Sequence, residues 1–285
     1  MDAASIPGHG AVQGFMEYAA DTFEAVGVAI RGAHVLVDTA DLMRHYRSAG
    51  AKVDPVDQEL HDAAVPARDS IAGDFAILHG HALMGAWGAL EACIDDVAID
   101  WLTETEGACA LSATNTLKVS LGDYLALKGD ARWPWLLDQI KRAQSSSLKS
   151  GVGQFETVLS AVGLGGGVDP HIRTAIHYTK AIRNVIAHKG GRVDARFVEA
   201  CPDLGLTEGE RLSVTSKQFL AGLTAMLAYS GAVYERSRVL AGAGARPPRL
   251  PWWVEDLASL PAAFTTSGAA RRGSKADSPD LDRTA

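Results

Sequence analysis

The chain has 285 residues, of which 47% are hydrophobic and 21% charged, and its formal net charge is −7 with an isoelectric point near 5.7. This is an ordinary globular composition, which excludes a fibrous or wholly disordered chain. The negative net charge also excludes long-range attraction of the whole molecule to a polyanion, so any contact with nucleic acid has to be local.

The three cysteines, Cys93, Cys109 and Cys201, are widely spaced and form no C-x-x-C pair. Neither a disulfide framework nor a zinc site is therefore encoded, and we expect no metal, no cofactor and a reducing cytoplasmic location. The start of the chain, MDAASIPGHGAVQGF, lacks the features of a signal peptide. The most apolar stretch, which begins at Phe219, is shorter than a membrane span, so we expect a buried helix and no membrane association.

The spacing of apolar residues predicts an all-α protein, whose first helix runs from 11 to about 46. The polar stretch at 52–70 contains two prolines and clustered charge, and predicts a connection. A long helix is expected at 71–102, where apolar side chains repeat mostly at threes and fours. Shorter helices are expected at 113–127 and 133–143.

The second half of the chain begins with a serine-rich loop and a short helix predicted near 154–162. The stretch GLGGGVDP then interrupts the helical pattern at 163–170. Asp169 is the expected N-cap and Pro170 the first residue of a helix that ends at Lys189. The two glycines that follow can adopt the left-handed conformation that ends a helix.

A last long helix is predicted at 215–240, after which small, polar and proline residues predict a flexible tail at 241–285. At most a short patch at 251–253 is expected to be ordered. No strand series is found. The predicted architecture is an all-α helical bundle, preceded by an N-terminal helical segment and linker at 1–70.

The stretch AIRNVIAHKGG, residues 181–191, places polar side chains between the rungs of an apolar helical ladder. Asn184 and His188 are four residues apart, so they stack on one face of the helix, and Arg183 reaches in from the adjacent row. The segment from His171 to Arg196 holds six Lys or Arg residues against one acid, a net charge of about +5. These residues predict a local phosphate-binding site.

Histidine exchanges protons near neutral pH, and arginine presents a planar fork of donors to phosphate oxygens. Together they suffice for RNA phosphodiester cleavage without metal. In this interpretation His188 moves the proton between the 2′-hydroxyl and the leaving oxygen, and Arg183 stabilises the charge on phosphorus. Asn184 either orients the imidazole or is only a polar residue on the wet face. Further side chains available to RNA phosphates are His177, Lys180, Lys189 and Arg192.

The stretch RNVIAH resembles the R-x-x-x-x-H signature of the HEPN superfamily. Its setting is similar as well, because RNVIAHKGGRVD closes a helix that follows a glycine-rich break, and CPDLGL and a long helix come after it. The earlier stretch HALMGAWGALEACIDDVAIDWL is similar to the opening helix of that family's bundle. The resemblance covers about 71–240.

The resemblance implies an antiparallel helical bundle that forms a homodimer. In the ribonuclease members, Arg and His of both protomers lie in a cleft at the two-fold axis. The implied activity is metal-independent cleavage of single-stranded RNA to a 2′,3′-cyclic phosphate. It also implies a role as a toxin or antiviral defence effector, with a nucleotidyltransferase-like antitoxin as a possible partner.

A structural interpretation of the same residues stays open. Arg183 would then pair with a carboxylate such as Glu91 or Asp95 on the first long helix of the bundle. His188 would then interact favourably with the helix dipole at the C-terminal end of its own helix. The protein would in that case be a non-catalytic helical module that binds RNA, a nucleotide or another protein.

Other features have plainer interpretations. His79 and His81 are two residues apart, which directs them to different sides of a helix and disfavours a metal site. The glycines at 163–167 follow no strand and lack the Lys-Ser/Thr ending of a phosphate-binding loop, so a turn is expected. Four tryptophans next to or near prolines are more typical of core or partner contacts than of base stacking. They are Trp133, Trp135, Trp252 and Trp253.

Overall fold

The computed structural model of the protein describes residues 6–47, 54–105, 107–108, 115–144, 151–244 and 256–265. Within these residues every regular element is a helix, which confirms the predicted all-α class. The β-type pairing found there is an isolated bridge between Arg192 and Arg211. None of the described helices is both long and apolar enough to cross a membrane.

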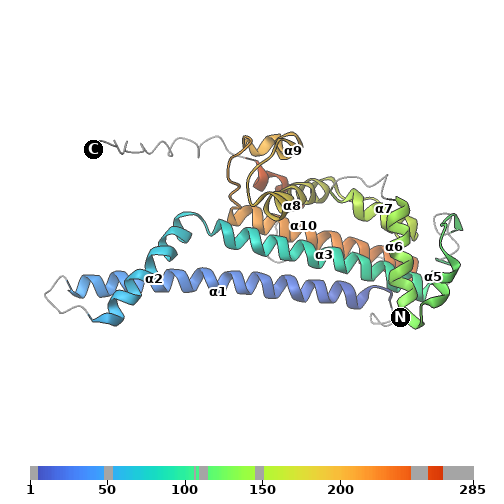
Figure 1. Ribbon diagram of the computed structural model, residues 1–285, viewed down its shortest axis with the longest axis horizontal. Helices are drawn as coiled ribbons and strands as arrows, with labels where there is room; N and C mark the ends of the chain where they lie inside the picture. The colour runs from blue at the N-terminus through green and yellow to red at the C-terminus, as the bar shows by residue number, and fades with distance from the viewer. Residues whose placement is uncertain are drawn as a thin grey trace.

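Four long helices build the body of the protein: α1 (His9–Arg47), α3 (Ala76–Glu104), α8 (Pro170–Lys189) and α10 (Ser216–Leu240). α3 and α10 pack against each other in the middle, with α8 on one side of this pair and α1 on the other (Figure 1). The start of α1 meets the end of α10, where the Ser237 hydroxyl donates to the Pro7 carbonyl at 2.6 Å. Gly80 near the start of α3 lies next to Ile186 near the end of α8, and α3 and α10 begin side by side. α1 and α8 thus run antiparallel to the central pair.

The first helix shares the core of the bundle. Its first three turns contribute Val12, Phe15 and Ala19 to the same buried cluster that holds Trp87 and Leu90 of α3. The C-terminal half of α1 extends beyond the bundle and pairs with α2 (Pro55–Ala72), so that the two helices form an arm (Figure 1). The core therefore continues across the predicted boundary near residue 70.

The predicted connection at 52–70 is wrong from residue 55 onward, because α2 occupies it. The Asp54 carboxylate accepts hydrogen bonds from backbone amides of the first turn of α2. The Asp57 carboxylate in turn accepts a hydrogen bond from the Asp54 amide, which makes a capping box. Pro55 stands at the first helical position, where a missing N–H costs nothing. The same acids and proline that suggested a loop are therefore helix-start signals, and only Pro66 lies inside the helix.

The turn between α2 and α3 is fixed by a contact with the start of α10, which lies far away in the sequence. Asp74 and Phe75 adopt left-handed conformations, with φ of 49° and 50°, which is unusual for residues other than glycine. The Asp74 carboxylate accepts a hydrogen bond of 2.7 Å from the amide of Ser216, the first residue of α10. This turn makes α3 begin at Ala76 rather than at the predicted Ile71.

Smaller helices cover one end of the bundle: α5 (Leu121–Ala126), α6 (Arg132–Gln144) and α7 (Gly153–Ala161). The helix predicted at 113–127 is wrong over 117–120, which is irregular, and residues 113–114 lie outside the described part of the chain. α5 is short because Leu121 and Leu125 find no core, and both are more than 60% exposed.

Glu156 of α7 fixes the glycine-rich loop that leads into α8. Its carboxylate accepts hydrogen bonds from the Tyr229 hydroxyl at 2.8 Å, from Arg236 at 2.8 Å and from the Gly166 amide at 3.0 Å. The turn predicted at 163–167 is thus held in place by the Glu156 carboxylate, which accepts from its backbone. Its far end starts α8 at the expected cap, Asp169, whose side chain accepts from two backbone amides.

The predicted flexible tail is wrong for residues 256–265. Two 3-10 helices, η6 (Leu257–Ser259) and η7 (Pro261–Phe264), pack on α8, and η7 also contacts α10. Phe264 is fully buried, and its ring stacks on Tyr178 with 5.2 Å between centroids. Composition alone missed this segment because only two of its residues, Leu260 and Phe264, are buried. Trp252, Trp253 and residues 266–285 lie outside the described residues.

We predict that Phe264→Ala lowers the free energy of unfolding by about 3–5 kcal/mol, as expected for a buried aromatic side chain. A chain that ends at Leu240 loses the same contact and should be destabilised to a similar extent. Chemical denaturation measures both. Leu240→Ala, at a 57% exposed position, is the control and should change stability little.

Close packing in the middle of the bundle depends on Gly222 of α10. A Cβ at this position would lie 2.7 Å from Leu83 Cδ1 of α3 and 2.8 Å from Thr179 Oγ1 of α8. The three helices can approach this closely only because glycine has no side chain. The position of α8, and of everything it carries, follows from this contact.

We predict that Gly222→Ala destabilises the protein by about 1–3 kcal/mol, the usual cost of overpacking a core. Gly231→Ala is the matched control on the same helix, since a Cβ there meets nothing within 4 Å. It should stabilise the protein by about 0.5–1 kcal/mol through helix propensity. Equal effects of the two changes in chemical denaturation would contradict the packing argument.

Candidate functional site

The candidate site lies on α8 and is positioned by the buried side of the same helix. Ile182 and Val185 are 0% and 2% exposed and belong to the hydrophobic core. Because successive residues advance by about 100° around a helix, anchoring these two directs the neighbouring polar side chains outward. Arg183 and Asn184 are half-buried as a result, and His188 is exposed in the last turn.

Arg183 joins the predicted catalytic residues into one cluster. Its Nη1 lies 3.2 Å from Asn184 Oδ1 and 3.2 Å from His188 Nε2. A guanidinium only donates hydrogen bonds, so Nε2 of His188 accepts, which leaves the ring proton on Nδ1. Asn184 therefore orients the guanidinium of Arg183. The sequence interpretation had instead allowed that it orients the imidazole of His188.

Polar side chains from α3, α7 and α8 form a ring of contacts that includes Arg183. Nη2 of Arg183 lies 3.8 Å from Glu91 Oε2 on α3. The other oxygen of Glu91 accepts from Gln154 Nε2 of α7 at 3.4 Å, and Gln154 Oε1 accepts from Lys180 Nζ at 2.5 Å. Lys180 precedes Arg183 by three residues on α8, which closes the ring. Of the two carboxylates predicted as structural partners of Arg183, Glu91 is the one that contacts it.

Partial burial shifts the pKa values of two charged groups in and beside this ring, Lys180 and Asp95. Burial lowers the pKa of Lys180, the positive charge of Arg183 lowers it further, and Glu91 acts in the opposite direction. Asp95, one turn along α3, pairs with Lys141 of α6 at 2.5 Å. Burial raises the pKa of Asp95, and the bond to Lys141 opposes that shift.

A pocket of about 490 Å³ opens beside His188, between α8 and α9 (Ala195–Ala200). Lys189 and Arg196 supply positive charge at this pocket. Asp194 supplies the negative charge, and it pairs with Lys189 at 3.5 Å. The pocket is lined by Ala181, Asn184, Val185, His188, Lys189, Asp194, Arg196, Phe197 and Ala200.

The residues predicted to contact RNA fall into different surroundings. Lys180 belongs to the ring under Arg183, and Lys189 lines the pocket. The Nε2 atom of His177 lies 2.9 Å from the Ala200 carbonyl, which ties α8 to α9. Arg192 donates to the Gly209 carbonyl at 3.2 Å, beyond the end of α8. The structure therefore brings Lys180 and Lys189 to the site. His177 and Arg192 instead contact backbone carbonyls of the segments that follow α8.

Two contributors were missed from the sequence. Gln154 reaches the site from α7, and a lone glutamine near a helix start gives no signal of this role. Arg196 lines the pocket and lies inside the basic segment that the charge count had singled out, so that count was the available signal. Trp133 packs partly buried against the core, which agrees with its plainer interpretation.

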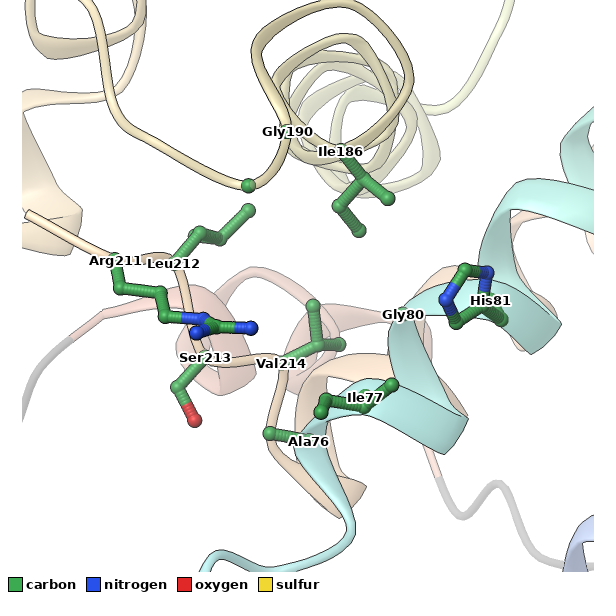
Figure 2. Close-up of a pocket in the computed structure, with 11 residues that line it drawn as sticks. Ala76, Ile77, Gly80, His81, Ile186, Gly190, Arg211, Leu212, Ser213 and Val214 are labelled. Carbon is green, nitrogen blue, oxygen red and sulfur yellow. The ribbon is translucent and has the colours of Figure 1, made fainter.

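A second pocket of about 430 Å³ lies on the other side of the end of α8 (Figure 2). Figure 2 shows Ile186 of α8 facing Val214 and Ile77 across it, with the Arg211 guanidinium at its edge. Ile186 and His188 are about 200° apart around the helix, so this pocket is separate from the Arg183 cluster. Its lining is mostly apolar.

The two histidines at the start of α3 point to different sides, as predicted. His79 is 1% exposed and stacks on Phe219 of α10, whereas His81 lines the second pocket. Across the described ranges, no group of three or more His, Cys, Asp or Glu side chains is placed to hold a metal ion.

Comparison with known proteins gives no match: no protein-family model, curated protein or solved structure is significantly similar to the chain. The HEPN resemblance therefore stays a prediction that rests on the residues of α8 and their setting.

We predict that Glu91→Gln lowers the pKa of Lys180 further, because the Glu91 carboxylate is the group that raises it. NMR of methylated lysines as a function of pH measures the change. Asp95→Asn is the matched control and should leave Lys180 unchanged, since Asp95 contacts Lys141 instead. An unchanged Lys180 in Glu91→Gln would show that the carboxylate does not act on this site.

Proposed function

We propose that the protein is a metal-independent endoribonuclease that cleaves single-stranded RNA to a 2′,3′-cyclic phosphate. One observation carries the proposal: Arg183 and His188, five residues apart, lie in direct contact at 3.2 Å on an accessible helix face. A phosphate-binding donor and a proton acceptor at this separation can act on neighbouring atoms of one phosphodiester.

In the proposed reaction, Nε2 of His188 takes the proton of the 2′-hydroxyl, and the 2′-oxygen attacks phosphorus. The bond from phosphorus to the 5′-oxygen breaks, and that oxygen takes up the proton from His188 as it leaves, which returns the imidazole to its neutral form. The products are a 2′,3′-cyclic phosphate and a 5′-hydroxyl. Arg183 turns from the imidazole to the phosphate oxygens, which frees the Nε2 lone pair and stabilises the charge that develops on phosphorus.

The surroundings of the cluster suit a bound RNA strand. Lys189 and Arg196 place positive charge around the pocket next to His188, where the nucleotide that flanks the cleaved bond would lie. Asn184 holds the guanidinium in its plane through the 3.2 Å bond. Since the three proposed catalytic side chains already meet within one protomer, the proposed reaction does not require the composite cleft that the resemblance implies.

A second candidate function is a helical module that binds RNA, a nucleotide or another protein without cleaving it. The ion pair between Arg183 and Glu91 favours it, because a guanidinium that faces a carboxylate is partly neutralised. The two candidates differ in outcome, since the module binds RNA and leaves its length unchanged.

The cellular role is proposed from the resemblance alone. A cytoplasmic toxin or antiviral effector would need a partner to restrain it, and a nucleotidyltransferase-like antitoxin is the partner that the resemblance implies. A gene for such a protein next to the gene of this chain would favour this role.

We predict that His188→Ala lowers RNA cleavage by roughly 100- to 10,000-fold, the usual effect of removing a positioned acid or base. RNA binding should survive. Arg183→Ala should lower cleavage and binding together, because the guanidinium contacts the phosphate before the transition state as well as in it. Cleavage of labelled RNA in EDTA and binding of an RNA with a 2′-deoxy cleavage site measure the two effects.

His171→Ala is the matched control, as it removes an exposed histidine from the first turn of the same helix. It should leave cleavage unchanged, and all three variants should keep the melting temperature of the unmodified protein. Full activity in a folded His188→Ala protein would end the catalytic assignment. Tight RNA binding by an unmodified protein that cleaves no RNA would instead establish the non-catalytic module.

A further inference from the structure

The C-terminal half of α1 carries a row of residues at alternating spacings of four and three. The row, called the α1 seam below, faces solvent. Its apolar members are Val28, Val35, Leu42 and Tyr46, which are 55%, 64%, 55% and 67% exposed. This spacing is the heptad pattern of a helix that packs against another helix along a coiled-coil seam. The α1 seam consists of Val28, Gly32, Val35, Thr39, Leu42 and Tyr46.

The α1 seam lies on the side of the helix opposite to the core. Val26 and Ala40, which are 5% exposed, point about 120° to 160° away from Val28 when each residue advances by about 100°. α2 packs on that buried side as well, since Arg68 of α2 pairs with Asp41 at 2.5 Å. α1 is therefore covered on one side by its own chain and carries a second apolar side that the described chain leaves open.

We propose that the α1 seam binds the α1 seam of a second copy of this chain, in antiparallel orientation. A two-fold axis level with the peptide between Ala33 and His34 sets the register. It places Gly32 opposite Val35 of the second copy and Val28 opposite Thr39. Leu42 lies opposite Ala25 of the second copy, which continues the same row by one step towards the start of α1. Glycine and alanine thus face the larger valine and leucine, and a Cβ on Gly32 would meet nothing within 4 Å, so the two helices have room to approach.

The charges beside the α1 seam are complementary under this pairing. In a coiled coil, the residues that flank the seam select the partner and its orientation. Antiparallel pairing brings Arg31 within reach of Asp38 of the second copy, and Glu24 within reach of His45 of the second copy. Each of these contacts occurs twice because of the two-fold axis. Parallel pairing would instead direct Arg31 towards Leu36, where it has no charge to meet.

The length and rigidity of the helix also suit this partner. From Val28 to Tyr46 the seam runs about 27 Å at 1.5 Å per residue. Such a seam is short for an isolated coiled coil, but α1 is already held as a helix by the bundle and by α2, so pairing orders little new structure. α8 lies on the opposite side of the central helix pair from α1 (Figure 1). The two Arg183–His188 sites are therefore far apart in this dimer, which does not form the composite cleft that the resemblance implies.

Leu42→Glu tests the apolar part of the proposal. Light scattering of the full chain at about 100 μM should give a dimer for the unmodified protein, and the variant should raise the dimer dissociation constant at least about 100-fold, because two buried carboxylates face the seam. Val56→Glu is the matched control at a 68% exposed position of α2 and should leave the dimer intact. Helix content and melting temperature should be unchanged in both.

A charge exchange tests the orientation. Arg31→Glu or Asp38→Arg alone should weaken the dimer about tenfold, since two attractions become two repulsions. The double variant should restore it. Restoration occurs only where these residues face each other across the two-fold axis, so weakening without restoration would overturn the antiparallel register.

A monomeric unmodified chain at this concentration would overturn the proposal, and so would a Leu42→Glu chain that stays dimeric. RNA cleavage by the Leu42→Glu monomer keeps this outcome separate from the proposed function. Cleavage at the unmodified rate is expected, because the catalytic side chains of each protomer lie far from the α1 seam. An unmodified protein that dimerises as described and cleaves no RNA would leave the pairing standing without the nuclease.

Discussion

The contact that the rest of the structure depends on is the one that α3, α8 and α10 share at Gly222. The side chains of Leu83 and Thr179 fill the space that a Cβ would need, so both rest directly against the backbone of α10. Interiors packed to this density transmit displacements instead of absorbing them. Thr179 lies four residues before Arg183, so the placement of the polar cluster is fixed about one turn from this contact.

The cluster itself combines two opposing demands. Glu91 and Gln154 hold Arg183 and Lys180 in place through contacts from two other helices, which limits the freedom of long side chains. The same carboxylate offsets part of the positive charge that would attract a phosphate. A guanidinium that is held and partly neutralised loses little entropy when a ligand binds, but it has to exchange one anionic partner for another.

Local signals in the sequence were sufficient for α8. Asp169 and Pro170 begin it as their residue types require, and Gly190 ends it with a φ of 59°. The spacing of Asn184 and His188 also placed both on one face. The contacts that arise between helices could not be read in this way, since neither Gln154 nor Phe264 belongs to a pattern. α2 was missed for another reason, because Asp and Pro are common to turns and to helix starts and only the capping bonds distinguish them.

The meeting of the two ends of the bundle has a consequence for the order in which the protein folds. The Ser237 hydroxyl donates to the Pro7 carbonyl, and His9 contacts the Tyr234 hydroxyl at 3.0 Å, across 230 and 225 residues of chain. On the ribosome α1 emerges first and α10 last, so α3 can dock on α1 early but the central pair stays incomplete until synthesis is nearly finished. During that interval the core face of α3 that α10 later covers is open to other chains. Slow elongation near the end of the message would prolong this exposure, and a chaperone that shields α3 would matter most at that stage.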